Sequence, residues 1–163
     1  MIKDYVSNAC GKYNIDNLLE IMALLRSEDG CPWDKVQTHE SIRGALIEET
    51  YEAADAIDKN DMSALKEELG DVLMQVVFHA QIERENGGFN FDDVCDEVCR
   101  KLIIRHPHVF SNVQAGNTDE AVNSWEQVKQ QTKGQTTYTE TLESVAVSLP
   151  ALMRAQKVGK RAA

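Results

Sequence analysis

The sequence predicts an all-α fold. Apolar residues recur every three or four positions through most of the first 105 residues, which is the period of a helix with one buried face. Turn-forming residues interrupt this pattern, and no stretch alternates apolar and polar residues as a half-buried strand would. With 163 residues, 42% of them hydrophobic, the chain is long enough for one compact domain with a substantial core.

The expected helices have local causes for their ends. Asp16 and Thr38 are suited to cap the starts of the first two helices through their side-chain oxygens. Gly87 and Gly88 are expected to end the third helix, and Pro107 prevents the fourth from continuing. In chain order the helices are expected at Asp16–Ser27, Thr38–Asp58, Ser63–Asn86, Phe91–Arg105 and Thr118–Thr132.

The second and third helices each carry an apolar stripe. The stripe of the second consists of Ile42, Leu46, Ala53 and Ile57, and that of the third of Leu65, Leu69, Val72, Leu73 and Val76. Further apolar residues, Met74, Phe78 and Ile82, lie off the main stripe, so the third helix needs neighbours on several sides. We therefore expect a four-helix-bundle-like arrangement that is completed when two subunits form a homodimer or a higher oligomer.

Acidic residues interrupt these apolar stripes in two clusters. The clusters are Glu48, Glu49 and Glu52 in the second helix, and Glu67, Glu68 and Asp71 in the third. At about 100° per residue, Glu49 lies in the middle of its stripe and Glu52 at its edge. Glu68 flanks the stripe of the third helix, and Asp71 lies on the same side. Carboxylates at the edge of a core are costly unless a cation lies between them, so a metal site is predicted.

The turn between the two helices predicts how the carboxylates pair. The segment 58–61, Asp-Lys-Asn-Asp, is short enough to force an antiparallel hairpin. Glu52 and Glu68 each lie eight residues from Asn60, whereas Glu49 and Asp71 each lie eleven. Equal offsets place Glu52 opposite Glu68, and Glu49 opposite Asp71. Four carboxylates at one helix interface favour Mg²⁺, with Mn²⁺ as a substitute, over zinc.

A solvated surface is the alternative interpretation of the same residues, because glutamate-rich helix faces usually face water. Against it stand the position on the apolar stripes, the matched offsets, and the presence of only two nearby lysines, Lys59 and Lys66. Glu67 is expected to point away from the site. The role of Glu48 stays open between a catalytic one, in which it positions water or assists a second ion, and simple solvation.

Several segments resemble the MazG-type nucleoside triphosphate pyrophosphohydrolases. The residues 46–52 (LIEETYE) and 67–71 (EELGD) are similar to the EExxE and ExxD signatures of that family. Five further segments, in the family's order, are GCPWD at 30–34, QTHE at 37–40, VVFHA at 76–80, RHPHVF at 105–110 and WEQVK at 125–129. The resemblance implies an all-α, oligomeric hydrolase that converts nucleoside triphosphates to monophosphate and pyrophosphate with Mg²⁺. It also implies that Glu49, Glu52, Glu68 and Asp71 are the metal ligands.

The same resemblance implies where the substrate binds. Lys101 and Arg105, four residues apart on one helix face, and Lys129, one turn after Trp125, are expected to contact phosphates or substrate. Each of these cations also has the ordinary interpretation of a surface charge. Trp33 and Trp125 are the only tryptophans, and each is either a stacking surface for the nucleobase or part of the core.

The composition of the whole chain limits the other functions. The formal net charge of −10 and a sequence pI of about 4.8 argue against a nucleic-acid-binding surface. No apolar run approaches the ~20 residues that span a bilayer, and the first residues lack a signal-peptide core, so a cytoplasmic location is expected. Cys10, Cys31, Cys95 and Cys99 form no CxxC pair; neither a disulfide nor zinc is indicated, and Cys95 and Cys99 are expected to be buried.

The end of the chain is expected to be separate from the rest. Residues 1–133 are expected to form the MazG-like catalytic domain, and 134–163 a linker with a connector helix that is partly disordered. The segment 131–141 is rich in Gln and Thr and is interpreted as a flexible linker. Another helix is expected from about residue 148, with Pro150 in its first turn.

Two other functions are compatible with a cluster of carboxylates on helices. A di-iron site requires Glu-x-x-His pairs, and none of the four histidines has a glutamate three residues before it, so iron is disfavoured. His79 is interpreted as a core histidine more readily than as a catalytic one. A protein that binds nucleotide or metal without catalysis stays open as the alternative function.

Overall fold

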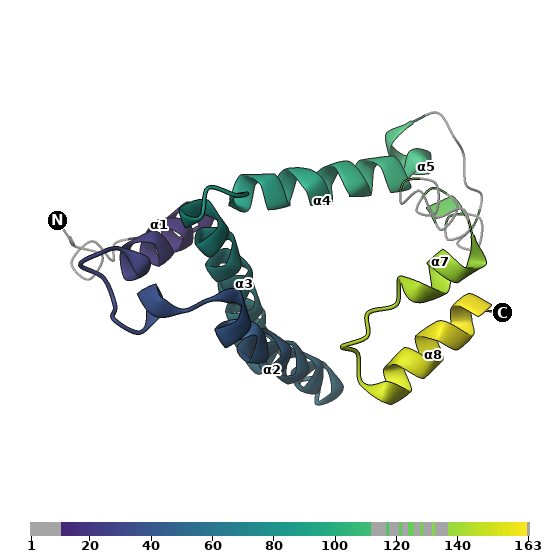
Figure 1. The fold of residues 1–163 in the computed structure, drawn as a ribbon, viewed down its shortest axis with the longest axis horizontal. Coiled ribbons are helices and arrows are strands. Elements are labelled where there is room, and N and C mark those ends of the chain that lie inside the picture. Colours follow the sequence, from purple (N-terminus) through teal and green to yellow (C-terminus); the bar gives the residue numbers. More distant parts are fainter. Residues whose placement is uncertain are drawn as a thin grey trace. The chain divides into compact units, whose positions relative to one another are not determined.

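The prediction of an all-α fold is confirmed. The computed structural model describes residues 11–111 and 137–162, and between them positions 117, 121, 124, 125, 128 and 132. These described residues form helices and no strand (Figure 1). The chain divides into two compact units, Met1–Asp96 and Glu97–Ala163, and each is described here by itself.

From residue 11 onwards, the first unit contains three long helices and one short turn. They are α1 (Ile15–Arg26), the 3-10 turn η1 (Asp34–Val36), α2 (His39–Asp58) and α3 (Met62–Glu85), and the start of α4 (Phe91–Arg105) also belongs to this unit. Each predicted boundary of these helices lies within one residue of the observed one.

One predicted cap is wrong. Thr38 caps α2 as predicted, but Asp16 lies inside the first turn of α1. The cap of α1 is Asn14, whose side chain accepts a hydrogen bond from the backbone N–H of Asn17, while the Asn17 side chain accepts from the backbone N–H of Asn14. This reciprocal pair satisfies two backbone donors that Asp16 could not both satisfy.

Among the described residues of the second unit, the rest of α4 is followed by shorter helices. These are α5 (Pro107–Phe110), α7 (Tyr138–Glu143) and α8 (Ala151–Ala162). The predicted helix 118–132 lies mostly outside the described residues, and the described positions 121, 124, 125, 128 and 132 are helical. Arg161 donates 2.6 Å hydrogen bonds to the Thr141 carbonyl and the Ser144 hydroxyl, which ties α8 to α7.

The prediction of a flexible linker at 131–141 is wrong for residues 138–141. Helix α7 begins at residue 138, inside the segment interpreted as flexible. The cause is a capping box, in which the Thr137 hydroxyl accepts from the backbone N–H of Glu140 and the Glu140 carboxylate accepts from that of Thr137. Pro150 precedes α8 instead of lying in its first turn.

A tight turn joins α2 to α3. Asn60 has a left-handed backbone with φ of 54°, its N–H donates to the Ile57 carbonyl, and the N–H of Asp61 donates to the Ala56 carbonyl. This is the Schellman arrangement that closes a helix C-terminus. The carboxylate of Asp61 then accepts from the backbone N–H groups at 63 and 64 and caps α3. Asp61 therefore makes the last hydrogen bond of α2 and also caps the start of α3, and the predicted antiparallel hairpin forms.

The core of the first unit lies where α1, α2 and the second half of α3 meet. The buried cluster is Met22, Ile42, Val77, Phe78 and Ile82, with Leu18, Leu19, Met74 and Phe91 packed against it. The expectation that the main stripe of α3 forms the core and the off-stripe residues are secondary was therefore wrong. Leu69 and Leu73, on the predicted main stripe, are 54% and 40% exposed, because α1 packs against the later turns of α3, where the off-stripe residues lie.

Two further sequence expectations can be compared with the described residues. No described helix is long and apolar enough to cross a membrane. Cys31, Cys95 and Cys99 are free thiols, and the expectation that Cys99 is buried was wrong, since it is exposed.

Candidate metal centre

Three of the four predicted metal ligands meet at the interface between α2 and α3. Oxygen atoms of Glu49, Glu68 and Asp71 all lie within 4.8 Å of one another. Glu49 comes from the middle of α2, and the other two come from the first turns of α3. The turn at Asn60 sets this alignment, because it leaves no spare residue that would let one helix slide along the other.

Burial and like charges together disfavour the ionised form of two carboxylates in this cluster. The pKa of Glu49 is raised by burial first, and then by the charges of Asp71, Glu52 and Glu68. The pKa of Glu68 is raised by burial, then by Glu52 and Asp71. Among the charges, Asp71 acts most strongly on Glu49 and Glu52 most strongly on Glu68, which matches the pairing expected from the turn offsets. Glu52 also interacts with both glutamates through its side chain, although it is itself exposed.

These four side chains suit a hard divalent cation. They offer only carboxylate oxygens, and their mutual repulsion favours protonation unless a positive charge neutralises it. The nearest lysine of the turn, Lys59, pairs instead with Asp55 within α2. Glu48 and Glu67 are exposed and are not among the three residues whose oxygens converge.

The predicted substrate cations lie in the second unit. Lys101 forms an ion pair with Glu97 at 3.6 Å, and the guanidinium of Arg105 lies 5.3 Å from the centre of the Trp125 ring. The Nε of Arg105 is buried and has no hydrogen-bond partner in the part of the chain that is described. Glu97, Arg100, Lys101, Ile104, Arg105 and Thr132 line a hollow of about 350 Å³. Lys129 lies outside the described residues.

Trp33 lies in the first unit and is not part of the core. It immediately precedes η1, and 61% of its surface is exposed. Trp125, in contrast, is half-buried beneath Arg105. The core interpretation is therefore wrong for Trp33, because the loop that carries it turns the indole outwards.

A histidine pair that sequence reasoning missed joins the start of α2 to α3. The Nδ1 atoms of His39 and His79 are 2.7 Å apart and their rings are stacked, while the Nε2 of His39 lies 2.8 Å from Glu83. Burial, and then the charge of His39, lowers the pKa of His79. The Nε2 of His79 is buried and has no partner among the described residues. The expectation that both ring nitrogens of a core histidine are hydrogen-bonded therefore holds for Nδ1 and is wrong for Nε2. Forty residues separate the two rings in the chain, and no local pattern indicates the pair.

A second missed residue is Arg26, at the end of α1. Its guanidinium holds Glu85 through three hydrogen bonds of 2.7 to 3.1 Å and lies 5.2 Å from the centre of the Phe78 ring. The sequence signal available was an arginine four residues after the buried Met22, which places it on the core side of α1.

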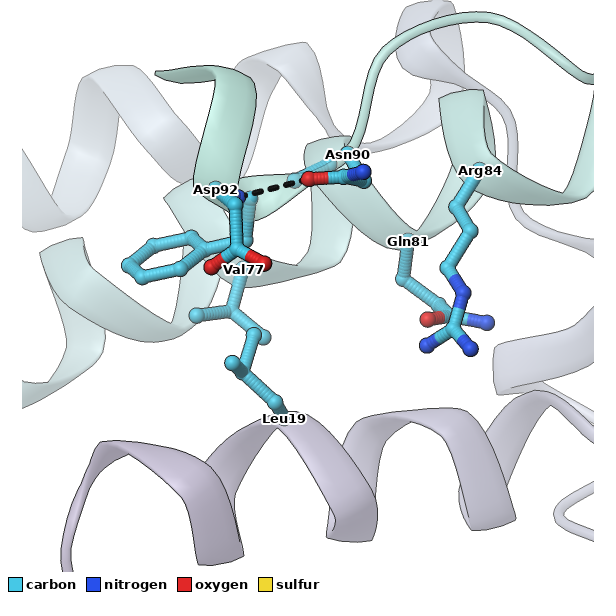
Figure 2. Close-up of a pocket in the computed structure, with 8 residues that line it drawn as sticks. Leu19, Val77, Gln81, Arg84, Asn90 and Asp92 are labelled. Atoms are coloured by element: carbon cyan, nitrogen blue, oxygen red, sulfur yellow. Dashed lines mark hydrogen bonds between the residues drawn. The ribbon is translucent and has the colours of Figure 1, made fainter. Parts of the chain in front are cut away.

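A separate hollow of about 260 Å³ opens where α1, the end of α3 and the start of α4 meet (Figure 2). Leu19, Val77, Ala80 and Phe91 form its apolar part, and Gln81, Arg84, Asn90 and Asp92 its polar part. The Asn90 side chain accepts a 2.7 Å bond from the backbone N–H of Asp92. This hollow belongs to the last turns of α3, whereas Glu68 and Asp71 belong to its first half.

Comparison with known proteins identifies the family. The family model of the MazG nucleotide pyrophosphohydrolase domain matches residues 37–110. A nucleoside triphosphate pyrophosphohydrolase of Escherichia coli (strain K12) is 50% identical over 150 residues, which cover 91% of this chain and 57% of that protein. A crystal structure of a mazG-related protein from Thermotoga maritima matches with a TM-score of 0.60 and 31% identity, covering 71% of this chain and 99% of that one. The chain belongs to the MazG family.

The MazG match covers some of the candidate residues and omits others. Residues 37–110 include the four carboxylates, Lys101 and Arg105, but not Trp33, Trp125 or Lys129. The chain spans about half the length of the curated relatives it matches; another MazG pyrophosphohydrolase, from Thermotoga maritima, is 45% identical over 56% of its length.

Proposed function

We propose that this protein hydrolyses nucleoside triphosphates to the monophosphate and pyrophosphate, with water attacking the α-phosphorus and Mg²⁺ as the cofactor. The observation that carries the proposal is the convergence of Glu49, Glu68 and Asp71 within 4.8 Å in a MazG chain. The curated relatives named nucleoside triphosphate pyrophosphohydrolases support the reaction class. The ion is proposed from the chemistry of the site, and the attacked phosphorus from the products that the MazG resemblance implies.

The chain's own residues divide the task. Glu49, Glu52, Glu68 and Asp71 would hold the cation, since their oxygens are hard ligands and their charges repel one another without it. When bound, Mg²⁺ neutralises phosphate charge and lowers the pKa of a water ligand. A formal net charge of −10 would otherwise repel the triphosphate. Glu48 is assigned to water positioning beside the ligands.

The substrate contacts are proposed from residues outside the carboxylate cluster. Lys101, Arg105 and Lys129 contact phosphates, and the Arg105 Nε, buried without a partner among the described residues, is a donor ready for an anionic oxygen. Trp33 and Trp125 contact the nucleobase or its sugar.

The assembly is proposed to be a homodimer. Leu69 and Leu73 lie one turn apart on α3 and are substantially exposed, although they belong to the apolar stripe of that helix. A second copy would cover them as the sequence pattern requires. The cytoplasmic location expected from the sequence stays a prediction.

The test is pyrophosphate release from a panel of nucleoside triphosphates, with and without Mg²⁺. The panel includes deoxy, methylated and deaminated nucleotides, because nothing in the site identifies the base. Glu68→Gln removes one ligand charge and should lower kcat/KM by at least about 100-fold, the usual scale for loss of a group that acts on the transition state. The matched control is Glu67→Gln, which removes a charge from the adjacent exposed position and should keep activity within about threefold of wild type.

The outcomes separate the two candidate functions. If wild-type protein binds nucleotides in the presence of Mg²⁺ but releases no pyrophosphate from any of them, the non-catalytic alternative replaces the hydrolase. If Glu67→Gln loses as much activity as Glu68→Gln, the assignment of the metal ligands is wrong.

A further inference from the structure

One buried arginine connects the segment 27–38, which joins α1 to α2, with the end of α3. The side chain of Arg26 is only 5% exposed. Its Nη1 donates to the carbonyl of Asp34 at 2.6 Å and to that of Gln37 at 3.2 Å. The other donors of the same guanidinium hold Glu85 at the end of α3. Arg26 therefore connects both ends of η1 to α3.

Further contacts fix the shape of this segment from within. The Gln37 side chain donates to the Trp33 carbonyl at 2.8 Å, and Lys35 donates to the Glu28 carbonyl at 3.2 Å. A Cβ on Gly30 would lie 2.3 Å from the carbonyl oxygens of Leu24 and Leu25, so the chain packs directly against the end of α1 there. A connecting segment with so many fixed carbonyls has few conformations to exchange between.

This firmly attached segment exposes two hydrophobic side chains. Trp33 is 61% exposed and Val36 is 65% exposed. They are three residues apart around a 3-10 turn, which places them on the same side of it. Stability of the fold alone does not require an exposed tryptophan, whereas recognition of a flat ligand benefits from an aromatic surface whose conformation is already fixed.

We propose that Arg26 is a positioning residue, which holds the segment 27–38 so that Trp33 is presented to the base of the nucleotide. The proposal rests on the proposed function, because it takes a nucleoside triphosphate as the ligand. The chemistry divides between two residues: Trp33 supplies a planar apolar contact, and Arg26 supplies the hydrogen bonds that keep this contact from moving. The Glu85 carboxylate neutralises the charge of the buried Arg26 guanidinium.

Fluorescence of Trp33 tests the positioning role without any substrate. Since Trp33 and Trp125 are the only tryptophans, a Trp125→Phe protein reports on Trp33 alone. In that background Arg26→Lys keeps the charge but cannot donate to the carboxylate and both carbonyls together. The steady-state anisotropy of Trp33 should fall and its quenching by acrylamide should rise. The matched control, Arg84→Lys, changes an exposed arginine of α3 and should leave both readings at the wild-type value.

Steady-state kinetics test the ligand. In protein that retains Trp125, Arg26→Lys and Trp33→Ala should each raise KM for the triphosphate at least about fivefold while kcat changes less than about twofold, since the contact binds ground state and transition state alike. Should Arg26→Lys unfold, Glu85→Gln serves as the second variant. It leaves the loop contacts of Arg26 in place, and its anisotropy should fall by a smaller amount.

Different measurements would overturn the positioning role of Arg26, the nucleotide contact of Trp33 and the proposed hydrolase function. Unchanged Trp33 anisotropy in both the Arg26→Lys and Glu85→Gln proteins overturns the positioning role, whether or not the protein hydrolyses nucleotides. A folded Trp33→Ala protein with the wild-type KM overturns the nucleotide contact and leaves the hydrolase assignment standing. Absence of any pyrophosphate release from wild type defeats the proposed function, while the anisotropy still reports on Arg26.

Discussion

Glu49 is a side chain that destabilises the pairing of α2 and α3 in the absence of a cation and yet is one of the proposed metal ligands. It lies among three other carboxylates at a helix interface, and its pKa is raised by burial and by those charges. In the absence of a cation the repulsion acts against the pairing of α2 and α3. The same charge becomes favourable once a cation is bound, so the sign of its contribution depends on the ligand.

We therefore expect Glu49→Gln to melt at a higher temperature than wild type in the presence of a chelator, by about 2 °C or more. With millimolar Mg²⁺ the order should reverse, because only wild type gains the full stabilisation from binding. Thermal melts with and without Mg²⁺ measure both effects. Glu67→Gln should retain the Mg²⁺-dependent increase. A wild-type melting temperature that is indifferent to Mg²⁺ and Mn²⁺ would contradict the metal site.

His79 should make stability depend on pH. Its pKa is lowered in the folded state by burial and then by His39, so below the ordinary histidine pKa of about 6.5 the unfolded chain binds more protons than the folded one. Stability is then complete above that pH and falls as the pH drops towards the lowered value. The titratable group in contact with His79 is His39 from α2, whose Nε2 lies 2.8 Å from Glu83.

The measurement is urea unfolding at pH 7.5, 6.5 and 5.5. His79→Gln should lose less stability over this interval than wild type, because an amide does not titrate. Parallel loss in the two proteins would show that groups other than His79 account for the dependence.

At the scale of elements, the turn between α2 and α3 does most to define the site. Asn60 adopts φ of 54°, a conformation that asparagine and glycine tolerate and β-branched residues do not. The carboxylates lie eight and eleven residues from Asn60 on both helices, so a change in the conformation of the turn would shift α2 relative to α3 and move the carboxylates apart.

Asn60→Val should lower the free energy of unfolding by about 1–2 kcal/mol, since it forces a β-branched residue into the left-handed region. Asn60→Gly should stay within about 0.5 kcal/mol of wild type. Chemical denaturation of the pair isolates backbone strain from loss of the asparagine side chain. Equal destabilisation by the two substitutions would instead assign the effect to that side chain.

The helices and the carboxylate pairing were predictable because their causes are local. Caps such as Thr38, the turn at Asn60 and the break at Gly87 act over a few residues, and the offsets from Asn60 follow from the helix rise alone. Contacts between distant segments were not predictable in this way. The stacking of His39 on His79 depends on how α2 meets α3 and leaves no local pattern in the sequence. The spacing of Arg26 from Met22 places it on the core side of α1 but does not identify Glu85 as its partner.

The assignment of buried faces failed for a related reason. Leu69 and Leu73 look like core residues in the sequence, yet within one chain α1 packs against Phe78 and Ile82 instead. A hydrophobic stripe shows that a face needs a partner and does not identify which element provides it. On the scale of the whole molecule, the exposed leucines are the strongest reason to expect a second copy.

Wild-type protein should therefore sediment at about twice the chain mass of 18.3 kDa. Leu69→Lys should shift it towards the monomer, because a charge cannot be buried in an apolar interface without a partner. The control is Glu67→Lys, which adds a lysine two residues away and, at about 100° per residue, on the opposite side of α3. Analytical ultracentrifugation distinguishes the species, and a monomeric wild type would refute the dimer.

The short turn at Asn60 also bears on the order in which the protein folds. Contacts between α2 and α3 join residues that are close in the chain, and such contacts form faster than those between distant segments. The hairpin should therefore assemble early during folding, before α1 has docked on Phe78. At that stage its carboxylates already face one another while little apolar burial opposes their repulsion. Divalent cations in the refolding solution should then accelerate folding as well as stabilise its product.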